Sequence, residues 1–115
     1  MKEKMLVTGG TGFIGYHILK KLKGKFSIIS LSSKKPITKR KIKNIKYLKC
    51  DISNKKSLFD KLSKIKKIDY VINLAGYVDH SNKKKTFETH YYGCKNLVDY
   101  LSYKKIKLFI QIGSS

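Results

Sequence analysis

The 115-residue sequence predicts an α/β fold, in which a parallel β-sheet carries helices on both faces. Short apolar runs alternate with longer segments whose apolar residues recur at helical spacing. The first apolar run leads directly into a glycine-rich turn, and a helical pattern follows that turn. Right-handed crossovers between five such runs predict the strand order 3-2-1-4-5 within one domain, residues 1–115.

The first strand, predicted at 4–8, is followed by a turn that leads into a helix at 13–23. Gly9 allows the chain to turn where a side chain would clash, and Gly12 allows the backbone to approach a pyrophosphate. Gly15 allows the helix to pack closely on the strand behind it. The first helical turn offers unpaired N–H groups to phosphates. The pattern predicts a dinucleotide-binding turn, and the alternative is a glycine-rich turn that binds nothing.

Residues 8–15, which read Thr-Gly-Gly-Thr-Gly-Phe-Ile-Gly, resemble the nucleotide-binding signature of the extended short-chain dehydrogenase/reductase family. That family includes NAD-dependent nucleotide-sugar epimerases and dehydratases. The resemblance covers essentially the whole chain and implies a Rossmann-type fold that binds NAD or NADP. In the turn, it implies cofactor contacts for Gly9, Gly12, Phe13, Ile14 and Gly15.

The charge of the chain is strongly positive, with 27 basic residues against 7 acidic ones and a formal net charge of +20. Such a surplus attracts nucleic acid, acidic membranes and phosphorylated ligands. Only Arg40 is an arginine, although base recognition and bidentate phosphate binding favour arginine. The lysines are scattered rather than gathered in one stripe. We favour a solvated lysine surface over a nucleic-acid partner, and a real anionic partner is the alternative.

Cys50 and Cys94 show neither a Cys-x-x-Cys pair nor a metal-ligand spacing, so the sequence predicts free thiols and no metal site. The N-terminal apolar run is too short for a signal peptide or a membrane span. We therefore expect a cytoplasmic protein without a membrane partner.

The second strand, predicted at 27–31, ends at Ser32. In the family, the residue at this place selects the cofactor, and an acidic residue would hydrogen-bond the ribose 2′-hydroxyl of NAD. Ser32 is instead followed closely by Lys34 and Lys35. A hydroxyl followed by cations suits a 2′-phosphate, which favours NADP slightly over NAD. The alternative is that the two lysines belong to the general surplus.

A basic loop at 34–44 and a third strand at 45–49 lead to Asp51 and Ile52. An aspartate followed by an apolar residue contacts adenine at this place in the family. The resemblance implies that Asp51 does so through a side-chain oxygen and that Ile52 packs on the base. An alternative, compatible with this role, is that Asp51 or Ser53 caps the next helix, predicted over about 57–65.

The fourth strand and its exit, at 69–76, resemble the family motif Asn/His-x-Ala-Gly/Ala. The cofactor passes close to the backbone there, and the resemblance implies contacts for Leu74, Ala75 and Gly76. Residues 77–85 predict a polar loop. A lone histidine in it, His80, is given no role.

The helix predicted over 86–103 resembles the family pattern Asn-x-x-Gly-Thr-x-Asn-Leu at Gly93, Asn96 and Leu97. His90 stands where the family has an asparagine that supports the active site. A histidine donates a similar hydrogen bond but titrates near neutral pH, so the departure weakens the expectation of full activity. The face predicted to be buried consists of Phe87, Tyr91, Leu97, Val98 and Leu101.

The fifth strand, predicted at 107–112, is followed by Ser114, which matches the family's catalytic serine or threonine by position. The alternative is a plain serine at a strand end. The family's acid/base pair, Tyr-x-x-x-Lys, follows on the next helix. Every match to that pattern here lies before Ser114, so the chain resembles the N-terminal part of a longer enzyme, without its catalytic helix and substrate domain.

The leading hypothesis is therefore the NAD(P)-binding portion of an epimerase, dehydratase or reductase acting on a nucleotide-sugar. This portion is expected to be inactive alone, and a homodimer is an option for the full-length form. The alternatives are a non-catalytic NAD(P)-sensing or partner-binding module and, less favoured, a basic nucleic-acid-binding protein. An unprotected fifth strand predicts marginal stability or aggregation of the isolated chain.

Overall fold

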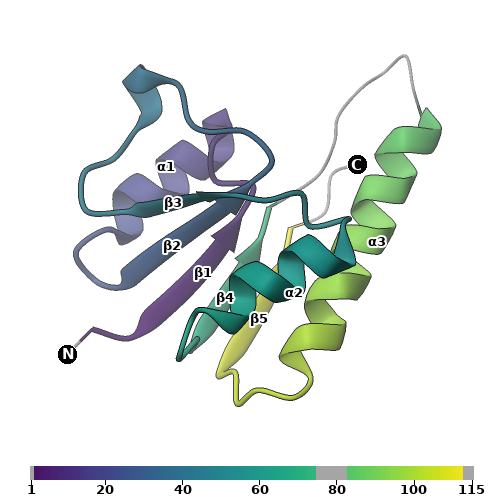
Figure 1. Ribbon diagram of the computed structural model, residues 1–115. Helices are drawn as coiled ribbons and strands as arrows, with labels where there is room; N and C mark the ends of the chain where they lie inside the picture. The colour runs from purple at the N-terminus through teal and green to yellow at the C-terminus, as the bar shows by residue number, and fades with distance from the viewer. Residues whose placement is uncertain (1, 75–82, 113–115) are drawn as a thin grey trace.

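The computed structural model describes residues 2–74 and 83–112 and, for residues 83–90, the backbone alone. Strands and helices alternate along these residues (Figure 1). The elements are β1 (Lys4–Thr8), α1 (Phe13–Leu22), β2 (Ser27–Ser32), the 3-10 turn η1 (Thr38–Arg40), β3 (Lys46–Lys49), α2 (Lys55–Ser63), β4 (Tyr70–Asn73), α3 (Lys83–Leu101) and β5 (Leu108–Gln111).

All strand pairs in the described sheet are parallel, and the strand order is β3-β2-β1-β4-β5. The predicted order is therefore confirmed. Thr8, the last residue of β1, pairs with Leu31 of β2 on one side and with Asn73 of β4 on the other. The chain moves outward from β1 to β2 and β3 and then crosses back to β4. The point where the strand order reverses thus lies between β1 and β4, which is where open α/β sheets bind ligands.

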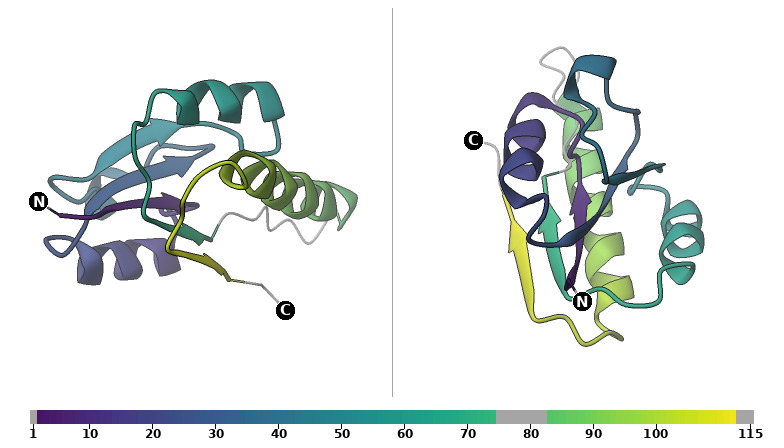
Figure 2. Two further views of the ribbon diagram at one scale, coloured as in Figure 1. Left: turned by 90° about the horizontal axis from the view of Figure 1, so that it is seen from below. Right: turned by 90° about the vertical axis from the view of Figure 1, so that its left-hand side faces the viewer.

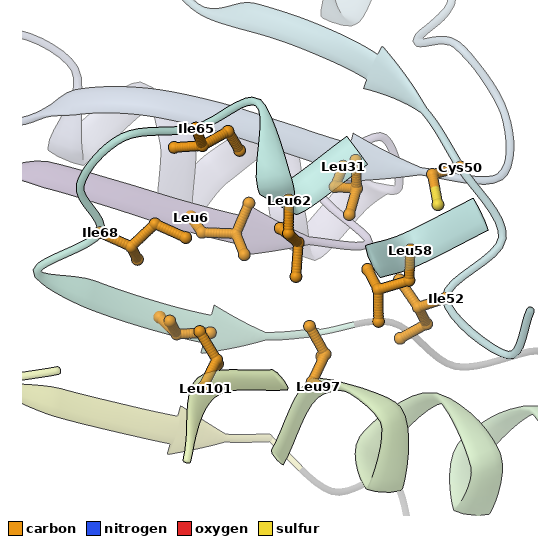
Figure 3. Packing of buried hydrophobic residues seen from close by; sticks show 11 residues of the cluster. Leu6, Leu31, Cys50, Ile52, Leu58, Leu62, Ile65, Ile68, Leu97 and Leu101 are labelled. Carbon is orange, nitrogen blue, oxygen red and sulfur yellow. The ribbon is translucent and has the colours of Figure 1, made fainter. Parts of the chain in front are cut away.

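Helix α1 covers one face of the sheet, and α2 and α3 cover the other (Figure 2). The burial of apolar side chains between these layers stabilises the fold. On the α1 face, Leu19 packs with Val7 and Ile28. On the opposite face, the sheet residues Leu6 and Leu31 pack with residues of α2 and α3 (Figure 3), and Val71 belongs to the same cluster. That cluster also contains Cys50, Ile52, Leu58, Leu62, Ile65, Ile68, Leu97 and Leu101.

Helix α3 differs from its prediction at its start and on its buried face. It begins at residue 83, so residues 83–85 are helical although a loop was predicted there. Leu97 and Leu101 are buried as expected, but Tyr91 and Val98 are about half exposed. The buried face instead includes Asn96, whose amide is paired with a main-chain carbonyl. The side chain of Phe87 lies outside the described residues.

The alternative, offered from the sequence, that Asp51 or Ser53 is the cap of α2 is wrong. Asn54 caps the helix, because its Oδ1 accepts a hydrogen bond from the Ser57 N–H at 3.1 Å. The Asp51 side chain lies outside the first helical turn. It closes a turn of its own by accepting hydrogen bonds from the N–H and hydroxyl of Ser53.

Strand β5 pairs with β4 alone among the described residues and lies at the edge of the sheet. Phe109 points to the cluster beneath α3. Its alternating neighbours Leu108, Ile110 and Ile112 are 40–51% exposed. Within the described part of the chain, no helix covers this side of β5 (Figure 2). The predicted edge position of the fifth strand is confirmed.

Candidate functional site

Those predicted binding residues that the structure describes lie at or just after the C-terminal ends of adjacent parallel strands, which brings them to one edge of the sheet. Gly9 follows β1, and its N–H donates to the Leu31 carbonyl of β2 at 3.0 Å. The N–H of Cys50, after β3, donates to the Ser32 carbonyl at 2.7 Å. The N–H of Leu74, after β4, donates to the Thr8 carbonyl at 2.8 Å. The turns after β1 and β3 are thereby fixed to the end of β2, and Leu74 is fixed to the end of β1.

The glycine turn combines tight packing with an open position. Gly9 has φ +78°, a conformation that side chains disfavour. A Cβ on Gly15 would lie 2.5 Å from the Gly10 Cα, so α1 packs directly against the turn rather than against the strand alone. A Cβ on Gly12 would meet nothing within 4 Å. The backbone at Gly12 therefore faces space that a ligand can occupy.

The N-terminus of α1 adjoins this open position. Gly12 is its N-cap, no side chain caps it, and its first turn contains no acidic residue. Uncapped N–H groups and the helix dipole make such an end favourable for an anion. Phe13 and Ile14 are each 64% exposed, so both are available for contact with a ligand.

Ser32 and Ser30 carry the buried side-chain oxygens that have no hydrogen-bond partner among the described residues. Ser32 is 7% exposed, and a buried hydroxyl without a partner is unfavourable by about 1–3 kcal/mol. A ribose hydroxyl or a water molecule would satisfy the Ser32 hydroxyl at the end of β2. Its position and its missing partner fit the predicted contact with a dinucleotide.

Asp51 and Ile52 occupy the turn after β3 in different ways. Asp51 is exposed, and Ser53 holds its Oδ1. The Ile52 side chain is buried in the cluster with Leu58 and Leu97, so it does not offer the exposed surface expected for packing on a base. The main-chain N–H of Ile52 is the group that remains available at this position, since it has no hydrogen-bond partner within the described residues.

Sequence reasoning missed two features at this edge. The first is Arg40 in η1, whose guanidinium carbon lies 5.9 Å from the centre of the Phe13 ring at the start of α1. A signal was available, because Arg40 is the only arginine and follows Lys34 and Lys35 in the same basic loop. The arrangement places a cation beside the uncapped start of α1.

The second missed feature is a row of polar side chains across the ends of three strands. Thr8 Oγ1 donates to Asn73 Oδ1, and Asn73 Nδ2 donates to Gln111 Oε1 at 2.6 Å. Thr8 and Asn73 are fully buried. Polar residues that end otherwise apolar strands are the signal that could have indicated it. The row joins β1, β4 and β5 at the point where the strand order reverses.

Three predicted site residues lie outside the described residues: Ala75, Gly76 and Ser114. The loop histidine His80 and the side chain of His90 lie outside them as well.

Both cysteines are free, as predicted, and burial raises the pKa of the Cys50 thiol, although a hydrogen bond with Ser57 opposes the shift. Across the described ranges, no group of three or more His, Cys, Asp and Glu side chains is placed to hold a metal ion. None of the described helices is long and apolar enough to cross a membrane.

Comparison with solved structures shows the same fold in proteins of low sequence identity. An epimerase from Methanothermobacter thermautotrophicus superimposes with a TM-score of 0.84 at 23% identity, over 99% of this chain and 36% of its own. A UDP-glucose 4-epimerase with UDP-glucose from Thermotoga maritima gives 0.81 at 22%, over 94% and 37%. A UDP-glucose 4-epimerase complex with NAD from Thermus thermophilus gives 0.75 at 22%, over 87% and 34%. The chain thus spans about a third of the length of these structures.

A comparison with curated protein sequences finds no significant match. The family model for the NAD dependent epimerase/dehydratase family matches residues 5–115, almost the entire chain. Its span includes the glycine turn, the end of β2 and the turn after β3, the three places where the structure assembles the candidate site. The chain therefore belongs to the NAD-dependent epimerase/dehydratase family.

Proposed function

We propose that residues 1–115 form an NAD(P)-binding domain that serves an epimerase, dehydratase or reductase acting on a nucleotide-linked sugar. The observation that carries the proposal is the open backbone at Gly12 beside the uncapped start of α1. Ser32, whose hydroxyl has no partner among the described residues, ends β2, and Asp51, whose carboxylate is exposed, follows the adjacent strand β3. UDP-glucose and NAD in two of the similar structures support the choice of ligand classes.

In this proposal the helix end binds the pyrophosphate, Ser32 binds the adenosine ribose, and Leu74 with Ala75 and Gly76 lines the path towards the nicotinamide. The bound dinucleotide supplies the group that accepts or donates a hydride. Ser114 is proposed to orient the substrate. Residues 1–115 by themselves are proposed to bind cofactor without turnover, because every Tyr-x-x-x-Lys match in them lies before Ser114, whereas the family's acid/base pair comes after the serine.

We further propose a modest preference for NADP. Ser32 and the lysines that follow it favour a 2′-phosphate over a 2′-hydroxyl, and Arg40 adds a guanidinium held beside the start of α1. No acidic residue forms an ion pair with Arg40 among the described residues. Calorimetric titration with NADPH and NADH tests both levels of the proposal. Binding of either dinucleotide supports the domain assignment, and tighter binding of NADPH supports the preference.

A non-catalytic NAD(P)-sensing or partner-binding module is the second candidate, favoured by His90 at the place of the family asparagine. Both candidates predict cofactor binding. They differ in turnover when residues 1–115 are joined to a segment that carries the Tyr-x-x-x-Lys helix, because only the enzyme domain is then expected to become active. A basic nucleic-acid-binding protein predicts the opposite pattern: affinity for DNA that falls steeply with salt, and no response to cofactor. A homodimer of the full-length form and a cytoplasmic location remain proposals, the latter supported by the two free thiols.

A further inference from the structure

Helix α3 holds the turn after β3 at two points. The Asn96 Nδ2 donates to the Ile52 carbonyl at 2.9 Å, across 44 positions of sequence, and both residues are 5% exposed. One helical turn earlier, a Cβ on Gly93 would lie 2.7 Å from both Cγ1 and Cδ1 of Ile52. The absence of a side chain at Gly93 therefore makes room for the Ile52 side chain, while Asn96 fixes the Ile52 main chain.

This arrangement leaves one donor and one acceptor beside each other at the turn. Because its side chain lies against α3 and its carbonyl is taken by Asn96, Ile52 retains only its N–H without a partner among the described residues. Ser53 donates two hydrogen bonds to Asp51 Oδ1, one from its N–H at 3.0 Å and one from its hydroxyl at 2.6 Å. Asp51 Oδ2 has no hydrogen-bond partner in the described part of the chain.

We propose that Asn96 and Gly93 are positioning residues that hold this donor and acceptor in register for the edge of an adenine base. The inference rests on the proposed dinucleotide binding and extends it to residues of α3, which need not touch the cofactor. Adenine offers an N6–H donor for the Asp51 carboxylate and an N1 acceptor for the Ile52 N–H. Hypoxanthine offers an acceptor and a donor at the same two places, so the same pair rejects it.

The rest of the turn is held independently of α3. The Cys50 N–H is bonded to the Ser32 carbonyl, and Asn54 caps α2. Removal of the Asn96 amide therefore leaves the turn attached at both ends while its middle is free to shift. The expected result is loss of base discrimination rather than loss of the fold.

The test compares NAD with nicotinamide hypoxanthine dinucleotide in calorimetric titrations of the wild-type chain, Asn96→Ala and Gly93→Ala. The wild-type chain is expected to bind NAD at least about tenfold more tightly, because hypoxanthine sets an acceptor against the Asp51 carboxylate and a donor against the Ile52 N–H. Asn96→Ala is expected to reduce the ratio of the two affinities to about twofold or less. Gly93→Ala displaces Ile52 without removing the amide, and it is expected to lower the same ratio. The ratio is unaffected by a change in the folded fraction.

Leu101→Val provides the control, since Leu101 is a buried residue of α3 in the same cluster and has no contact with the Ile52 carbonyl. It is expected to lower the melting temperature and keep the wild-type ratio. An unchanged ratio in a folded Asn96→Ala or Gly93→Ala variant overturns the positioning role and leaves the proposed function standing. Equal binding of both dinucleotides by the wild-type chain also overturns it. If the wild-type chain binds neither dinucleotide, the proposed function fails with it.

Discussion

Gly10 and Gly15 are in direct backbone contact, and the Gly10 Cα lies 2.5 Å from the place of a Cβ on Gly15. The first helix therefore approaches the turn as closely as two glycines permit. Gly12, between them in sequence, has open space in front of it. Glycines of one motif thus allow close packing at one position and leave open space at another.

Gly15→Ala is expected to destabilise the fold by about 1–3 kcal/mol, because the added methyl group must push α1 away from the turn. Urea unfolding followed by circular dichroism measures the change. Gly12→Ala is the matched control, and its φ of −80° is open to any residue, so its unfolding midpoint is expected to stay near that of the wild-type chain. Equal midpoints for the two variants would contradict the assigned roles.

Ile110→Lys is expected to reduce self-association of the chain without loss of stability. Ile110 lies on β5 and is 40% exposed, so a lysine there adds charge to an open strand edge. Phe109→Lys is the paired variant, because Phe109 packs on the cluster beneath α3 and its replacement buries a charge. Sedimentation at increasing concentration and thermal melts are the measurements. If Ile110→Lys leaves aggregation unchanged, the exposed edge of β5 is not its cause.

Asp69 is expected to make the stability of the chain depend on acid pH. The pKa of this carboxyl is lowered, first by the hydrogen bond from the Lys4 N–H at 2.9 Å and also by Lys67 at 3.5 Å. A pKa that is lower in the folded state stabilises the fold above the unfolded value, and this stabilisation is lost as pH falls through the folded value.

Asp69→Asn is therefore expected to flatten the decline in unfolding free energy below about pH 4, near the ordinary pKa of an aspartate. Asp60→Asn is the control, since Asp60 and its partner Lys64 are exposed and such a pair contributes little. Urea titrations from pH 7 downward give the slopes. A wild-type slope in Asp69→Asn would show that this carboxyl is not the source.

Arg40→Gln is expected to weaken NADPH binding by about tenfold and leave NADH binding nearly unchanged, since one charge-assisted contact with a 2′-phosphate is lost. Lys39→Gln removes one positive charge from the neighbouring residue of the same turn and serves as the control. Titration with 2′,5′-ADP isolates the phosphate contribution. If both variants weaken NADPH binding equally, general charge rather than Arg40 determines the preference.

The strand order and the glycine turn were predictable because they depend on local patterns: apolar runs, glycine spacing and the handedness of crossovers. The buried face of α3 could not be predicted in the same way, because the spacing of apolar residues predicts that Val98 is buried and that Asn96 is exposed. The structure shows the reverse. Asn96 is buried through a hydrogen bond to a carbonyl 44 positions away. The cap of α2 could not be predicted either, because several polar residues before the helix are suitable. The geometry of the turn places Asn54, rather than its neighbours, within hydrogen-bond distance of the Ser57 N–H. The pairing of Asn96 with Ile52 is long-range and has no local signature, whereas the Asn54 cap is a local contact that several neighbouring residues could equally have made.

Calorimetric titration of NADPH and NADH into the wild-type chain, Gly12→Leu and Gly24→Ala shows whether the glycine turn is the dinucleotide site. Gly24 has φ +86° and lies after α1, away from the candidate site, so its substitution strains the backbone without touching the ligand. We expect saturable binding to the wild-type chain and to Gly24→Ala, and none to a folded Gly12→Leu, whose side chain fills the open position. Binding that survives in Gly12→Leu would contradict the assignment of the glycine turn as the dinucleotide site.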